Sequence, residues 1–324
     1  MNRGALVKWG KEDLEGRGIA EPGAEAELLF LHSGKINRTE LYRDPEATVP
    51  PEEEEKYREL IWRRGERIPL FYLLGEREFW SLPIQVAPGV LIPRPETELL
   101  VEEALRLVKE CGLRNADCGM KKSSSPPALN SKLETRLRPV RAYGPEGNSE
   151  LFFLDLGTGS GAVALAILTE IPEARAWATD LSPDALRIAA GNARRLKLED
   201  RIRFLAGDLF GPLRQFREFF HLVVCNPPYI PSAVIPTLAP EVARGEPRLA
   251  LDGGEDGLQV IRRVAEEAFA YLQTPGFLLM EIGDTQAVAV RDLLARQGRY
   301  EDIRVIQDYS GRDRVVVAKK GQRL

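Results

Sequence analysis

The chain of 324 residues has few of the side chains that build metal centres or disulfide frameworks. It contains two histidines and three cysteines (Cys111, Cys118 and Cys225), and no two cysteines form a CxxC pair. A structural zinc site needs four such ligands at short spacings, and a disulfide framework needs paired cysteines. We therefore expect reduced thiols and no metal.

Long hydrophobic runs and an excess of basic residues are also missing. The longest apolar stretches, such as Leu222 to Cys225 and Phe277 to Met280, are far shorter than the roughly 20 residues that span a bilayer, and no signal-peptide region begins the chain. We expect a cytoplasmic protein with no membrane partner. The net charge of −4 does not favour a nucleic-acid backbone, so we expect no direct nucleic-acid substrate.

Hydrophobic residues make up 44% of the chain, which suffices for a large core, and the length of the chain indicates one large domain and a smaller one. Apolar residues at helical spacing predict a helical domain over 1–75, and short β-like runs with prolines and glycines predict a hairpin linker over 76–93. The large domain covers 94–324. Within it, residues 112–149 shift to Ser, Pro, Gly and Lys, which indicates a flexible insertion. Its surplus of bases leaves contact with RNA or an acidic partner open, although a solvated connector is the simpler interpretation.

After residue 150, strand-like and helix-like segments alternate, which is typical of an α/β domain with a parallel sheet. A helix is expected near 96–110. We expect strands near 151–156, 175–180, 202–207, 221–225, 276–282, 302–307 and 313–318, and helices near 161–170, 183–196, 257–273 and 285–297.

A glycine-rich turn follows the first of these strands, and acidic residues end three strands in succession. Asp155 closes the first strand, and the turn reads Gly157, Thr158, Gly159, Ser160, Gly161. Asp180 and Asp208 end the next two strands, so all three acids lie on one rim, where such sheets bind ligands. The turn is GxGxG rather than the GxGxxG of dinucleotide folds, and no GxxxxGK[ST] for ATP is present.

This arrangement resembles the cofactor site of class I S-adenosylmethionine-dependent methyltransferases. The resemblance implies a Rossmann-like, seven-stranded mixed sheet with S-adenosyl-L-methionine as cofactor and S-adenosyl-L-homocysteine as product. It assigns Asp155 and the turn Gly157, Thr158, Gly159, Ser160, Gly161 to the methionine portion. Asp180 is assigned to the ribose, and Asp208 with Leu209 to the adenine.

The fourth strand ends in Asn226, Pro227, Pro228 and Tyr229, hereafter the Asn-Pro-Pro-Tyr motif. The Asn226 side chain offers a carbonyl oxygen, and the prolines offer backbone carbonyls without N–H groups, so the turn is rich in acceptors and poor in donors. Such a turn suits a planar NH₂ group, held by Asn226 and the Pro227 carbonyl with the Tyr229 ring on its flat face. A glutamine carboxamide and an adenine amino group both qualify.

Segments spread along the chain then resemble the release factor glutamine methyltransferases. Those segments are 71–75, 91–98, 155–161, 226–230, 246–247, 251–254, 281–283 and 308–316. The resemblance implies a small N-terminal helical domain that helps dock the substrate, a linking β-hairpin, and methylation of the glutamine in the Gly-Gly-Gln motif of peptide chain release factors. Arg94, Glu96 and Glu98 are candidate docking residues, and Asn226 contacts both cofactor and substrate.

Three features depart from that family pattern: the long 112–149 insertion, a divergent N-terminal part, and His221 where aspartate is commoner. We interpret His221 as a strand residue rather than a base. Two rivals are considered. An adenine-specific DNA or RNA methyltransferase predicts a basic face and a separate target-recognition segment, and neither is seen outside the insertion. A non-catalytic binding protein predicts a damaged glycine turn or a lost Asn226, and both are intact. Within the same chemistry, the substrate glutamine could belong to a ribosomal protein.

Overall fold

A computed structural model describes residues 1–110 and 150–321, and the 112–149 insertion therefore lies outside the described residues. The chain divides into two units. The smaller, hereafter the helical unit, comprises 1–77, 86–88 and 238–246, and the larger, hereafter the transferase unit, comprises the rest. None of the helices in the described ranges is both long and apolar enough to cross a membrane.

The first 75 residues are helical, as predicted. They form α1 (Arg3–Gly16), α2 (Pro22–Gly34), α3 (Arg38–Arg43), α4 (Pro51–Gly65) and α5 (Leu70–Leu74). Two of these helices begin at residues that favour a helix start. Asn37 caps α3 in a capping box with Glu40, and Pro51 is the first residue of α4, followed by a run of glutamates. The unit packs around the buried Tyr57, whose ring meets Phe30 edge to face at 5.3 Å between centroids.

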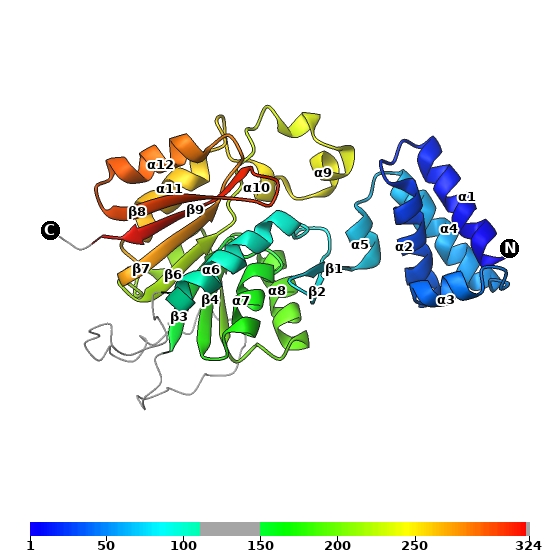
Figure 1. The fold of residues 1–324 in the computed structure, drawn as a ribbon, viewed down its shortest axis with the longest axis horizontal. Coiled ribbons are helices and arrows are strands. Elements are labelled where there is room, and N and C mark those ends of the chain that lie inside the picture. The colour runs from blue at the N-terminus through cyan, green and yellow to red at the C-terminus, as the bar shows by residue number, and fades with distance from the viewer. Residues whose placement is uncertain (111–149, 322–324) are drawn as a thin grey trace. The chain divides into compact units, whose positions relative to one another are not determined.

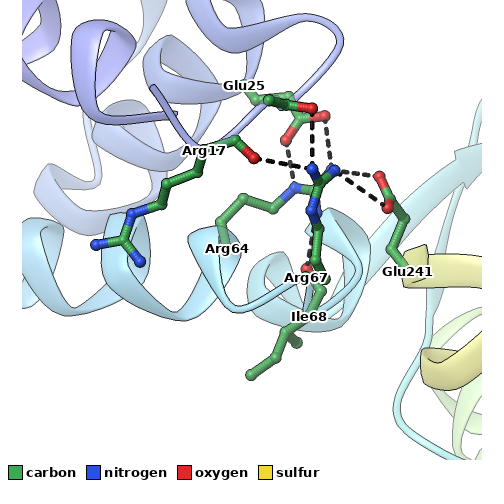
Figure 2. A network of polar contacts seen from close by, with 7 residues as sticks. Arg17, Glu25, Arg64, Arg67, Ile68 and Glu241 are labelled. Atoms are coloured by element: carbon green, nitrogen blue, oxygen red, sulfur yellow. Dashed lines mark hydrogen bonds and ion pairs between the residues drawn. The ribbon is translucent and has the colours of Figure 1, made fainter. Parts of the chain in front are cut away.

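The helical unit also contains a segment from far along the chain, α9 (Pro240–Gly245). Figure 2 shows how it is held: the Arg64 guanidinium, only 2% exposed, donates to both Glu25 and Glu241, at 2.5 Å and 2.8 Å. Arg67 adds a second ion pair to Glu241, 3.6 Å from its Oε2. A buried guanidinium needs such partners because an unpaired charge out of water is strongly unfavourable.

A two-stranded hairpin of β1 (Glu76–Phe79) and β2 (Leu82–Gln85) follows α5. Its tight turn places Trp80 and Ser81 at positive φ. The prediction of a hairpin is confirmed for these strands, but a third β-like run, 90–92, is not a strand. Pro88, Gly89 and Pro93 surround that run and disfavour strand pairing, and Val90 and Ile92 are buried without strand geometry.

The transferase unit has a seven-stranded sheet in the order β5-β4-β3-β6-β7-β9-β8 (Figure 1). The strands are β3 (Leu151–Leu156), β4 (Ala174–Asp180), β5 (Ile202–Ala206), β6 (Phe220–Cys225), β7 (Leu272–Glu281), β8 (Tyr300–Gln307) and β9 (Asp313–Lys320). The first five are parallel, while β9 runs antiparallel between β7 and β8. The sheet is therefore mixed. The connection from β8 to β9 is too short for the crossover that a parallel pair would need, so these two strands pair antiparallel.

Helices cover both faces of this sheet, which buries the continuous apolar strands at its centre. One face carries α6 (Glu98–Glu110), α7 (Ala162–Glu170) and α8 (Pro183–Arg195), and the other carries α11 (Gln259–Ala268) and α12 (Ala287–Arg296). The short helix α10 (Arg248–Leu251) lies between α9 and α11 in the chain. The helix predicted over 257–273 is wrong at its end. Helix α11 stops at Ala268, and Leu272 already pairs with β6 as a strand residue.

Candidate active site

A cavity of about 230 Å³ opens at the carboxyl ends of the parallel strands, entirely within the transferase unit. The sheet order puts β3 between β4 and β6, and all three strands are parallel, so the loops after these strands meet at one edge. The structure brings most of the predicted cofactor and motif residues together there, but Gly161 and Tyr229 are not among the residues that line the cavity. Lining residues include Asp155, Gly157, Thr158, Gly159, Ser160, Asp180, Asp208, Leu209, Asn226, Pro227 and Pro228.

The glycine turn has the backbone conformation that its glycines allow. Gly157 and Gly159 lie at φ of 67° and 56°, a region that other residues adopt only with strain. A Cβ at either position would meet no heavy atom within 4 Å, so the backbone there faces open space. Glycine is thus needed for conformation and for a close approach by a ligand, and α7 begins directly after the turn.

Asp180 holds this turn in place. One carboxylate oxygen accepts the Gly159 N–H at 2.8 Å, and the other accepts the Ser182 N–H at 2.8 Å. Each carboxylate oxygen has a second lone pair, so Asp180 can accept further hydrogen bonds from a ligand in the cavity. Burial raises the pKa of Asp180, while these backbone donors act in the opposite direction.

Asp155 is a buried carboxyl, 3% exposed, at the end of the central strand. The Thr158 hydroxyl donates to its Oδ2 at 2.6 Å. Burial raises the pKa of Asp155 to about 7, although Thr158 opposes that rise. A bound cation next to this buried carboxyl would stabilise its ionised form, which burial otherwise destabilises, so the site favours a positively charged ligand group.

Asp208 and Leu209 follow β5 and line the same cavity. Asp208 pairs with Arg263 of α11, whose Nη2 lies 2.7 Å from Oδ2, and both side chains are about half exposed. Leu209 sits at a φ of 45°, outside the usual regions for a leucine. Such a conformation is kept only when surrounding structure requires it, and it occurs often at ligand sites.

Asn192, a fully buried residue of α8, was not anticipated from the sequence. Its Nδ2 donates to the Ser160 carbonyl at 2.9 Å and to the Gln85 carbonyl at 3.0 Å, while its Oδ1 accepts the Gln85 N–H at 2.8 Å. One amide therefore ties the glycine turn to strand β2. The only sequence signal was an asparagine in an apolar helix face, which alone does not reveal its partners.

The Asn-Pro-Pro-Tyr motif leaves β6 beside the glycine turn. The Asn226 Nδ2 donates to the buried Thr97 hydroxyl at 3.1 Å, which turns the amide oxygen away from Thr97. The Tyr229 hydroxyl donates to Glu281 Oε1 at 3.0 Å. Burial raises the pKa of Tyr229 far above its usual value, and the adjacent carboxylate raises it further, so this phenol stays protonated.

Two residues outside the motif support its backbone. Gln286, at the start of α12, donates to the Tyr229 carbonyl at 2.9 Å and accepts the Gly283 N–H at 2.9 Å. Gly257 lies against the same carbonyl: a Cβ there would come within 2.4 Å of the Tyr229 oxygen. The path of the motif is therefore fixed by segments 28 or more residues away in sequence.

Of the candidate docking residues, Arg94 lies close enough for its charge to lower the pKa of Tyr229, against the rise that burial causes. Glu98 accepts the Trp80 N–H at 2.7 Å in the hairpin turn, and Glu96 is exposed. His221, 2% exposed, accepts the Phe152 N–H through Nδ1 at 3.0 Å. Burial lowers the pKa of His221 to about 4, so the imidazole is neutral at physiological pH. This agrees with its interpretation as a strand residue.

Known proteins resemble both parts of the chain. A model of the PrmC N-terminal domain matches residues 5–75, and a model of the methyltransferase domain matches residues 153–245. The Release factor glutamine methyltransferase of Moorella thermoacetica is 39% identical over 301 residues, covering 93% of this chain and 92% of that protein. The protein of the same name from Caulobacter vibrioides is 36% identical, covering 96% and 93%.

Among solved structures, the hMettl16 catalytic domain in complex with the MAT2A 3′UTR hairpin 6 has a TM-score of 0.52. It is 12% identical and covers 77% of this chain and 80% of that one. At this identity the likeness concerns the fold alone.

Proposed function

The chain belongs to the release factor glutamine methyltransferase family, and from that membership we propose that it methylates the side-chain amide nitrogen of a glutamine in peptide chain release factors. The methyl donor is S-adenosyl-L-methionine, and the target is the glutamine of the Gly-Gly-Gln motif. One observation carries the proposal: Asn226, Pro227 and Pro228, the acceptor-rich part of the motif, line the same cavity as the glycine turn.

The cavity fits the proposed cofactor. Gly157 and Gly159 leave open space beside the backbone, and Asp155 is a buried carboxyl that favours a cation such as the ammonium of a methionine portion. Asp180 would accept from ribose hydroxyls, and Asp208 with Leu209 would border the adenine. The bound cofactor supplies an electrophilic methyl group on a sulfonium.

The motif prepares the nitrogen for transfer. An amide nitrogen is a poor nucleophile because its lone pair is delocalised. Asn226 Oδ1 and the Pro227 carbonyl accept its two hydrogens and favour the tetrahedral nitrogen of the transition state over the planar ground state. The Tyr229 ring packs on the flat amide. No general base is needed, because a methylated amide cation is acidic enough to lose its proton to water.

Incubating the purified protein with methyl-labelled S-adenosylmethionine tests this function. We expect label in a release factor, and no label when the glutamine of its Gly-Gly-Gln motif is replaced by glutamate. A ribosomal protein fraction and DNA serve as alternative substrates in parallel reactions. Label in DNA or in ribosomal protein, with none in the release factor, would contradict the proposal.

The raised pKa of Asp155 predicts that cofactor binding strengthens as pH rises through about 7. Below that pH the carboxyl is mainly protonated in the free protein, and binding a cation must release the proton. We expect the dissociation constant at pH 5.5 to be about 30-fold larger than at pH 8, since pH 5.5 lies about 1.5 units below the pKa and each unit changes affinity by up to tenfold.

Calorimetry in buffers of different ionisation enthalpy measures both the affinity and the proton released. Asp155→Asn should weaken binding and remove most of this pH dependence. The matched control is Asp292→Asn, an exposed aspartate on α12, which should behave like the wild type. An unchanged pH profile in Asp155→Asn would show that another group controls binding.

A further inference from the structure

Gln286 is a buried glutamine at the N-cap of α12, and its side chain bonds to three backbone groups. Its Oε1 accepts the Gly283 N–H at 2.9 Å, and its Nε2 donates to the carbonyls of Tyr229 and Gly257 at 2.9 Å and 3.3 Å. A backbone N–H can only donate and a carbonyl can only accept, so these partners leave one orientation for the amide. The NH₂ group of Gln286 therefore faces the Tyr229 carbonyl.

The hydrogen bond to Tyr229 holds the far end of a short stretch of chain. At the near end, Cys225 is the last residue of β6 and pairs with Met280 of β7. At the far end, the Tyr229 carbonyl is held by Gln286. Only residues 226–228 lie between these two held points, and they carry the acceptors proposed for the substrate amide. A stretch this short, with two prolines of fixed φ, has little freedom once both ends are held.

Both ends are held by one continuous segment, residues 280–286, which joins β7 to α12. The same segment also contacts the side chain of Tyr229, whose hydroxyl donates to Glu281 Oε1 at 3.0 Å. A carboxyl group can accept from a phenol whether it is ionised or neutral, so this contact does not depend on the charge of Glu281. Tyr229 is thus held at its hydroxyl and at its carbonyl, which limits the movement of its ring.

We propose that Gln286 is a positioning residue for methyl transfer: it holds the Tyr229 carbonyl and thereby sets where the Asn226 and Pro227 oxygens lie relative to the cofactor methyl group. Gln286 is not among the described residues that line the cavity, so it acts through the motif rather than on the substrate. The proposal rests on the proposed function, because it explains how the acceptors stay in place for transfer. A displacement of such groups by about 1 Å can reduce the rate about 100-fold.

Gln286→Met tests the proposal, because methionine keeps the length of the side chain and removes its amide. We expect kcat for methylation of release factor to fall about 10- to 100-fold, with KM and cofactor affinity within about threefold of wild type, because placement of the acceptors matters most in the transition state. Gln307→Met is the matched control, since Gln307 is exposed and donates to Asp313 between β8 and β9. Wild-type kcat in Gln286→Met, or an equal loss in Gln307→Met, would overturn the proposal.

Gln286→Glu separates the two hydrogen bonds of the side chain. Glutamate keeps an acceptor for the Gly283 N–H, but an ionised carboxylate has no donor for the Tyr229 carbonyl. We expect kcat at pH 8.5 to fall at least 10-fold relative to wild type at the same pH. The ratio should recover as pH falls to 6, because a protonated carboxyl regains a donor. Full activity throughout this range would show that the Gly283 contact is enough and would refute the positioning role.

Carbonyl NMR separates this proposal from the proposed function, because it needs no substrate. Tyr229 is the only tyrosine in the sequence that an isoleucine follows. Protein with ¹³C-carbonyl tyrosine and ¹⁵N-isoleucine therefore gives one signal, which joins the Tyr229 carbonyl carbon to the Ile230 N–H. Loss of a hydrogen bond to a carbonyl oxygen moves the signal of its carbon upfield. We expect that shift in Gln286→Met and none in Gln307→Met.

The same signal reports whether the surrounding fold is intact. The Ile230 N–H donates to the Leu251 carbonyl at 3.0 Å, and its own shift should stay unchanged in Gln286→Met. An unchanged Tyr229 carbonyl signal in that variant would overturn the proposal. An upfield shift in a protein that methylates no release factor would instead place the failure in the proposed function, and the contact would stand.

Discussion

Replacing Asn226 by alanine should reduce methyl transfer by about 100- to 1,000-fold while cofactor affinity stays within about 10-fold of wild type. The variant removes an acceptor that acts on the substrate nitrogen in the transition state, and loss of one such preorganised group typically lowers kcat by this factor. The cofactor retains Asp155, Asp180 and the glycine turn, which lie on neighbouring strands. Single-turnover transfer to release factor and calorimetric titration of the cofactor measure the two effects separately.

Asn2→Ala provides the matched control for this substitution. Asn2 is an asparagine of the helical unit that caps α1 and donates to Glu46, so its loss affects contacts within that unit only. We expect wild-type kcat from it. Retained transfer in Asn226→Ala would exclude the acceptor role, and loss of cofactor binding in parallel with activity would assign Asn226 to the cofactor instead.

Replacing Gly257 by alanine should have a comparably large effect on transfer, although this residue lies far from the motif in sequence. The new Cβ would stand 2.4 Å from the Tyr229 carbonyl oxygen and 2.7 Å from Gln286 Nε2, closer than real Cβ contacts allow. The motif would have to shift, and displacement of a catalytic group by about 1 Å can reduce the rate about 100-fold. We expect kcat to fall by that factor, measured with release factor as substrate.

Gly298→Ala separates the steric effect from backbone strain. Gly298 has a φ of 60°, close to the 75° of Gly257, but a Cβ there meets no atom within 4 Å. Both variants bear the strain of a non-glycine residue at positive φ, about 1 kcal/mol. Both should therefore lose similar stability from this cause, and only Gly257→Ala should lose transfer. Equal kcat values in the two variants would show that the motif does not depend on Gly257.

The parts of the site that the sequence predicted are those encoded within a few residues. Asp155, Asp180 and the glycine turn stand at strand ends, where apolar runs stop and the parallel arrangement brings them to one edge. The Asn-Pro-Pro-Tyr motif was recognisable because its donor and acceptor chemistry follows from its residue types. The boundaries of six of the seven strands were predicted within two residues for the same local reason, and β7, which begins earlier than expected, was the exception.

The parts that sequence reasoning missed depend on contacts between distant segments. Thr97 was passed over between two charged candidates, and Glu281 was noted only as part of a resemblance. Both contact the motif through hydrogen bonds to residues 129 and 52 positions away. Asn192 and Gln286 likewise hydrogen-bond to backbone carbonyls that only the fold brings next to them. Such pairings have no local signature.

The buried ion pairs of Glu241 bear on how this protein could be divided or recombined. Residues 238–246 fold with the helical unit, although they lie more than 150 residues after α5 in the chain. Removing the first 75 residues would delete Arg64 and Arg67 and leave Glu241 with neither cation. The helical unit is thus discontinuous, and exchanging it between relatives would require transferring residues 238–246 together with the N-terminal stretches 1–77 and 86–88.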